Sequence, residues 1–159
     1  MDFQTLAIQP TNILKTNEGK IMTEKDKHAL VEKALVAREK SYSPYSHFAV
    51  GAALLTNDGE VFTGANIESS SYTPTVCAER VAIFTAVHEG KRNFSAIAIV
   101  GGKAGEKVKD FCAPCGVCRQ VMAEFAKEDF EIILYDGTVY KTYTLGELLP
   151  ISFTKDNLN

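Results

Sequence analysis

The chain has 159 residues, of which 45% are hydrophobic and 23% charged, so it can form one domain with its own core. Its net charge of −3 and the absence of a basic stripe argue against a nucleic-acid partner. No apolar run approaches the roughly 20 residues needed to cross a membrane, and the first residues lack the apolar run of an export signal. We therefore expect a cytoplasmic protein with reduced cysteines.

The first ordered element is predicted just after residue 21. Residues 1–21 are polar and aperiodic, and we expect them to be a flexible N-terminal extension of a domain that spans residues 22–159. Thr23 is suited to cap a helix, because Asp26 three residues later completes a weak capping box. Apolar residues then follow helical spacing to about Lys40.

The rest of the chain alternates between strand and helix patterns. Asn57-Asp58-Gly59 and Asp136-Gly137 are turn signals, and each stands between two runs that are typical of strands. A helix is expected after Pro114, which suits a first helical position. In chain order the predicted elements are strands at 47–56 and 60–66, a helix at 76–88, a strand at 95–101, a helix at 114–127, strands at 130–135 and 138–143, and a short helix or turn at 145–150.

This order predicts an α/β fold, with a five-stranded mixed sheet covered by helices on both faces. The strands around the second and third helices should be parallel neighbours, because a helical crossover returns the chain in the same direction.

Two short clusters carry the residues that suggest a reaction. Glu79 follows two residues after Cys77, and Cys115 and Cys118 form a later Pro-Cys-x-x-Cys segment. Three thiolates can hold a zinc ion with its fourth position open for water, and a nearby carboxylate can move protons on and off that water. Both clusters fall at predicted helix starts, where free N–H groups stabilise thiolate. We assign the three cysteines as zinc ligands, Glu79 as the proton carrier and Arg80 as a balancing charge.

Two other uses of the cysteines stay open. Cys112 stands three residues before Cys115, so a closed structural zinc site with four cysteines also fits the spacing. A redox Cys-x-x-Cys pair at a helix start fits Cys115 and Cys118 alone. Both alternatives leave Glu79 without a task. In the preferred interpretation Cys112 is a free thiol.

Five segments of the chain resemble the small zinc-dependent cytidine deaminases, in the order that this family has them. A Cys-x-Glu motif followed by Pro-Cys-x-x-Cys is typical of zinc deaminases that act on nucleobases, and Phe48 with Asn66-x-Glu68 narrows the resemblance to free nucleosides. It covers about residues 22–153. The segments are YSHFAVGAAL (45–54), NIE (66–68), TVCAER (75–80), APCGVCRQ (113–120) and ELLP (147–150).

The resemblance implies the three-layer α/β/α cytidine deaminase-like fold, one zinc ion per subunit and hydrolysis of cytidine or deoxycytidine in pyrimidine salvage. Using three cysteines resembles the class that forms homotetramers with shared active sites. In that class, Phe48 packs against the pyrimidine. Asn66 and Glu68 bind the ribose 3′-hydroxyl, and the Ala78 backbone and Glu79 hold the edge of the base.

Two aromatic residues resemble positions at the boundary between subunits of this class. Tyr72 is one of them. Phe153 occupies the place of an aromatic residue that the family sends from its C-terminal segment into a neighbour's active site.

Other functions remain as alternatives. A nucleoside-antibiotic deaminase shares both cysteine motifs, although Asn66-x-Glu68 favours cytidine. A non-catalytic, zinc-stabilised interaction module would hold the metal without an accessible fourth position, and the short acidic chain argues against an RNA or DNA editor. Each predicted substrate-binding residue also has a purely structural interpretation. Phe48 could belong to the core of a strand, and Asn66 and Glu68 could simply end one. Phe153 could cover its own subunit.

Overall fold

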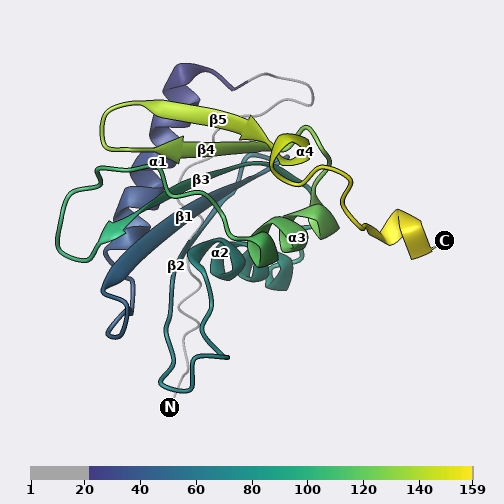
Figure 1. Ribbon diagram of the computed structural model, residues 1–159. Helices are drawn as coiled ribbons and strands as arrows, with labels where there is room; N and C mark the ends of the chain where they lie inside the picture. The colour runs from purple at the N-terminus through teal and green to yellow at the C-terminus, as the bar shows by residue number, and fades with distance from the viewer. Residues whose placement is uncertain (1–21, 159) are drawn as a thin grey trace, which may run out of the picture.

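Helices and strands alternate through residues 22–158, which the computed structural model describes (Figure 1). The helices are α1 (Glu24–Arg38), α2 (Ala78–His88), α3 (Gly116–Phe125) and α4 (Leu145–Leu148), followed by a 3-10 turn, η1 (Lys155–Leu158). The strands are β1 (Phe48–Thr56), β2 (Val61–Ala65), β3 (Phe94–Lys103), β4 (Glu131–Tyr135) and β5 (Tyr140–Thr144). The expected extension, residues 1–21, lies outside the described residues.

The strands form a five-stranded mixed sheet in the order β2-β1-β3-β4-β5. This confirms the predicted α/β class and sheet. The expected parallel pairing is right only for β3 and β4. It is wrong for β2 and β3, because β1 lies between them and pairs antiparallel with both. The tight β1–β2 hairpin leaves β2 at the sheet edge, and the connection through α2 carries the chain past β1.

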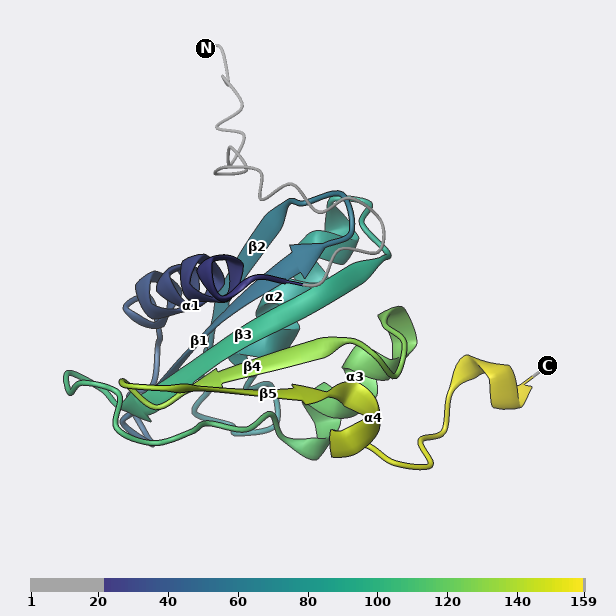
Figure 2. The same ribbon diagram turned by 90° about the horizontal axis from the view of Figure 1, so that it is seen from above.

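The sheet separates α1 from α2 and α3, which cover its opposite face (Figure 2). Successive residues of a strand point to opposite faces, so one strand supplies both halves of the core. Ala53 and Leu55 belong to the half under α1, and Ala52 and Leu54 to the half under α2 and α3. All four side chains are fully buried.

Helix α1 begins where the capping box was predicted. The Asp26 N–H donates to Thr23 Oγ1, and the Asp26 carboxylate accepts from the Thr23 N–H. Met22, directly before the cap, is buried in the core half under α1. Within residues 22–158, no helix combines the length and the apolar character that crossing a membrane would need.

The C-terminal end of α1 lies directly on the start of β1. A Cβ atom added at Gly51 would lie 2.1 Å from the Ala34 carbonyl oxygen and 2.4 Å from the Arg38 nitrogen. Only a residue without a side chain allows this approach, so Gly51 determines how α1 sits over the strand that begins at Phe48.

The variant Gly51→Ala tests this contact. Because the added methyl group meets backbone atoms, which cannot move aside alone, we expect a loss of about 1–3 kcal/mol in the free energy of unfolding. Urea unfolding would measure the loss. Gly116→Ala is the control, since an added Cβ there meets nothing within 4 Å. Equal midpoints for the two variants would contradict the close contact.

Candidate active site

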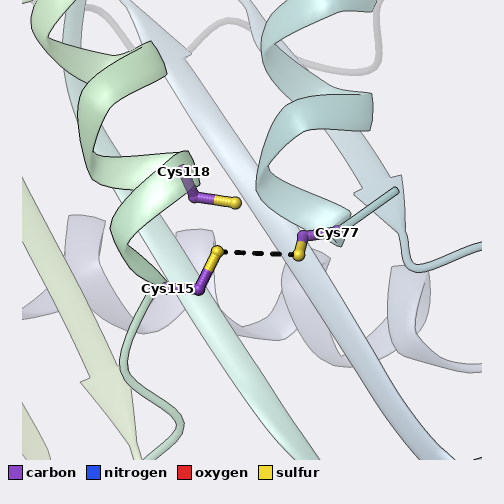
Figure 3. A group of neighbouring side chains, drawn as sticks. All are labelled: Cys77, Cys115 and Cys118. Carbon is purple, nitrogen blue, oxygen red and sulfur yellow. Dashed lines mark hydrogen bonds between the residues drawn. The ribbon is translucent and has the colours of Figure 1, made fainter. Parts of the chain in front are cut away.

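The N-termini of α2 and α3 converge on one cluster of thiols (Figure 3). Cys77 is the N-cap of α2 and Cys115 the N-cap of α3, and neither side chain caps its own helix with a hydrogen bond. Cys118 lies in the first turn of α3 and is buried. The three sulfur atoms lie within 4.8 Å of one another, and the sulfurs of Cys77 and Cys115 are 3.9 Å apart. The structure thus brings together the three predicted ligands.

The cluster fits a zinc ion. Zinc–sulfur bonds of about 2.3 Å at tetrahedral angles place two sulfurs about 3.8 Å apart, close to the separation of Cys77 and Cys115. All four cysteines are free thiols, so the cluster is not a disulfide. Among the described residues, the group of three does not include Cys112. The geometry therefore favours a three-cysteine site over the closed four-cysteine alternative.

Arg80 supplies positive charge to the cluster. Its Nη2 donates to the Cys77 sulfur at 3.5 Å, and its buried Nε meets no acceptor among the described residues. Hydrogen bonds from the Cys118 thiol and then from Arg80 lower the pKa of Cys77. For Cys118 the effect is the reverse: the hydrogen bond between the Cys118 and Cys77 side chains, followed by burial, raises the pKa of Cys118. The charge of Arg80 therefore favours the thiolate form of Cys77, which is the form that binds a metal ion.

Glu79 is buried in the first turn of α2, with 4% of its surface exposed. Burial, and then the charge on Cys77, raises the pKa of Glu79 to about 7, while its own backbone N–H acts in the opposite direction. A carboxyl group in this range exchanges protons readily near neutral pH. The Glu79 carboxyl and the Cys77 thiol therefore belong to the same end of α2, and this proton-exchanging group stands beside the thiol cluster.

Cys112 and Phe48 both lie against Gly101 of β3. A Cβ added at the adjacent Gly101 would lie 2.6 Å from the Cys112 sulfur and 3.1 Å from Phe48 Cε1. Burial raises the pKa of Cys112 to about 11, so the thiol stays neutral. A cleft of about 250 Å³ opens between Phe48, Cys112 and the loop that follows β3. Phe48 is 42% exposed, so it is a surface residue here rather than part of the strand core.

Asn66 and Glu68 hold the segment that leads into β1. Asn66 Nδ2 donates to the Phe48 carbonyl at 2.8 Å, and its Oδ1 accepts from the Val50 N–H at 2.8 Å and from Ser41 Oγ at 2.6 Å. The Glu68 carboxylate accepts hydrogen bonds from the backbone N–H groups of Tyr45 and Ser46 and from the Ser46 hydroxyl. These bonds, led by the Ser46 hydroxyl, lower the pKa of Glu68.

The two predicted boundary residues lie on the surface of the single chain. The Tyr72 ring is 73% exposed and its centroid lies 6.1 Å from that of Tyr45. Phe153 is 60% exposed, and its carbonyl accepts from Gln120 Nε2. Its segment follows α4 and runs away from the sheet (Figure 2). One subunit therefore leaves both rings uncovered.

Three supporting side chains were missed by the sequence analysis. Ser41 and Ser46 bond to Asn66 and Glu68. Arg119 donates to the carbonyls of Pro114 and Leu148, which ties the Pro-Cys-x-x-Cys segment to α4. Ser46 and Arg119 do lie in two of the segments that carry the resemblance, which was the signal that could have found them, whereas Ser41 gave none beyond its place in the loop before β1.

Known proteins match both the fold and the cysteine motifs. The family model described as "Cytidine and deoxycytidylate deaminase zinc-binding region" matches residues 24–134. A cytidine deaminase of Halalkalibacterium halodurans is 47% identical over 136 residues, which cover 84% of this chain and 98% of that protein. The crystal structure of cytidine deaminase from Burkholderia pseudomallei is 48% identical with a TM-score of 0.74, and the match covers 83% of this chain and all of that chain.

A relative that is named for a different substrate also matches. The blasticidin-S deaminase of Bacillus cereus is 35% identical over 130 residues, or 80% of this chain and 91% of that protein. The scaffold is therefore similar to deaminases with more than one substrate.

Metal analysis of Cys115→Ala and Cys112→Ala tests the ligand set. We expect one zinc ion per native chain, loss of zinc in Cys115→Ala and full zinc in Cys112→Ala. Because the ligands join α2 to α3, Cys115→Ala should also unfold at a lower temperature. Binding at a free-zinc concentration a hundredfold above Kd is worth about 2.7 kcal/mol of stability. Zinc retained in Cys115→Ala but lost from Cys112→Ala would overturn the assignment.

Proposed function

The chain belongs to the cytidine deaminase family, and we propose that it hydrolyses cytidine and deoxycytidine to uridine and deoxyuridine, releasing ammonia. One observation carries this proposal: the buried Glu79 carboxyl lies at the same helix end as a cluster of three thiols that fits zinc. A closed structural site would give this carboxyl no task. We place the reaction in pyrimidine salvage in the cytoplasm.

Cys77, Cys115 and Cys118 would hold the zinc, which supplies a Lewis acid and lowers the pKa of water. The positive charge of Arg80 and the N-terminal ends of α2 and α3 offset the negative charge of the three thiolates. Because these positive charges offset the thiolates, the site does not become strongly anionic beside a substrate that gains a proton.

Glu79 would carry two protons in turn. It takes the first from water and gives it to the ring nitrogen next to C4, while the water oxygen bonds to C4. It then moves the remaining hydroxyl proton to the amino group, the C4–N bond breaks and ammonia leaves. Because Glu79 is buried, the protons pass to the substrate rather than to bulk water.

A hydroxyl group would complete the hydrogen bonding of Asn66 and Glu68. One N–H of Asn66 Nδ2 donates to the Phe48 carbonyl, which leaves its second N–H as a donor. The Glu68 carboxylate accepts three hydrogen bonds, one fewer than its lone pairs allow. A hydroxyl both donates and accepts, and the ribose 3′-hydroxyl is the group that we place here.

The base would then lie between Phe48 and the start of α2. Phe48 offers an exposed ring for packing against the pyrimidine, and the Ala78 backbone together with Glu79 holds the edge of the base. The exposed rings of Tyr72 and Phe153 support a homotetramer in which neighbouring subunits complete each active site.

A second candidate substrate is a nucleoside antibiotic of the blasticidin-S type, because a deaminase of that name is 35% identical to this chain. Parallel assays with cytidine and blasticidin S distinguish the two. The 3′-hydroxyl site at Asn66 and Glu68 favours cytidine.

Glu79→Gln tests the proton carrier. Glutamine keeps the shape of the side chain but accepts no proton, so we expect turnover of cytidine to fall by about 10²–10⁴-fold. Zinc content should be unchanged. Loss of ultraviolet absorbance by cytidine reports the rate. Glu89→Gln, at the opposite, exposed end of α2, is the control. Native turnover in Glu79→Gln would remove this residue from the mechanism.

An analogue without the hydroxyl tests the sugar site. We expect the native enzyme to use 3′-deoxycytidine with a kcat/KM about tenfold or more below that for cytidine, because a lost hydrogen bond to a charged group costs about 1.5–3 kcal/mol. In Glu68→Gln the two substrates should become more nearly equal. If the ratio is the same in both proteins, Glu68 does not contact this hydroxyl.

A further inference from the structure

Arg38 is a buried cation that the proposed reaction does not use. It ends α1, and only 5% of its surface is exposed. Its guanidinium donates to three backbone carbonyls: from Nε to Ala49 at 3.0 Å, from Nη1 to Glu106 at 3.0 Å and from Nη2 to Lys103 at 2.6 Å. The acceptors come from two segments that are far apart in the sequence.

Burying this charge is costly, and within residues 22–158 the guanidinium has only a long ion pair to offset the cost. This pair joins Arg38 Nη1 to Glu39 Oε1 at 3.9 Å, and Glu39 is itself exposed. A guanidinium keeps its charge and presents its N–H groups in a fixed planar fork. Arg38 therefore fixes the relative positions of its three acceptors rather than forming a strong salt bridge.

Those acceptors surround the backbone of Phe48. Ala49 is the next residue along β1, and Lys103 stands opposite Phe48 in the antiparallel ladder between β1 and β3. Glu106 closes the turn after β3, where its N–H donates to the Lys103 carbonyl. The His47 carbonyl accepts from the Ala104 N–H of the same turn. Arg38 thus holds the start of β1 and the end of β3 together, next to the pair that Phe48 forms with Lys103.

The turn held by Arg38 also forms one wall of the cleft beside Phe48. Lys103 and Glu106 line that cleft together with Phe48 and Cys112. On the other side of β1, Asn66 holds the Phe48 carbonyl. The backbone that carries the Phe48 ring is therefore held at two adjacent carbonyls, that of Phe48 by Asn66 and that of Ala49 by Arg38.

We propose that Arg38 is a positioning residue for nucleoside binding, which acts by fixing the Phe48 ring and the width of the cleft beside it. The inference rests on the proposed function, in which Phe48 packs against the pyrimidine. Arg38 is the last residue of α1, which covers the face of the sheet opposite to α2 and α3, the helices that carry the thiols (Figure 2). Its loss should therefore weaken binding more than turnover.

Kinetics of Arg38→Gln and Arg38→Lys test the proposal. A misplaced ring should raise the KM for cytidine by about ten- to a hundredfold, with kcat within about twofold of native. Zinc content should not change. Arg38→Lys keeps the charge and one of the bonds, so it should fold and show a smaller rise in KM. Arg92→Gln is the matched control, because Arg92 also donates to backbone carbonyls, those of Val87 and Lys91, and is exposed.

A double-mutant cycle with Phe48→Ala separates positioning from general destabilisation. If Arg38 acts through the ring, Arg38→Gln should add little to the KM of Phe48→Ala. Fully additive effects, or a native KM in both Arg38 variants, would overturn the proposal. A native KM in Phe48→Ala alone would instead refute the proposed role of Phe48, and the positioning role would fail with it.

Discussion

The meeting of two helix N-termini is the constraint on which the site depends. Cys77 and Cys115 lie at N-cap positions, so the thiols come together only if α2 and α3 are both seated correctly. At Gly64, an added Cβ would lie 2.4 Å from the Ala78 carbonyl oxygen, and this close approach seats α2 on β2. Arg119 ties the segment before α3 to α4 through the carbonyls of Pro114 and Leu148. The packing of α2 and α3 therefore determines how far apart the three thiols lie.

Charge balance follows from the same arrangement. Three thiolates and one divalent ion leave a net negative charge, which the helix ends and Arg80 offset. Glu79 occupies the same helix turn, and its burial keeps its carboxyl ready to take up a proton. The groups proposed to bind the substrate lie on other elements: Phe48 begins β1, and Asn66 and Glu68 follow β2. The sheet therefore fixes the thiol cluster and the proposed sugar-binding residues relative to one another.

Local patterns predicted the parts of this structure that depend on local spacing. Cys-x-Glu and Pro-Cys-x-x-Cys place their side chains within one or two helix turns, and the Asn57-Asp58-Gly59 turn joins adjacent strands. Pairing of β1 with β3 escaped prediction, because it joins segments that are distant in the chain. The bonds of Arg38 reach residues 65 and 68 positions away, and its place in a helical pattern gave no sign of them. The hydrogen bonds of the Asn66 side chain to Ser41, Phe48 and Val50 likewise could not be predicted, because only the folded chain brings these residues together.

X-ray absorption at the zinc edge would test the central claim most directly. The account predicts three sulfur neighbours at about 2.3 Å and one oxygen or nitrogen neighbour, because three thiolates leave the fourth position open to water or substrate. Four sulfur neighbours would mean that Cys112 joins the site and closes it, which would contradict the account.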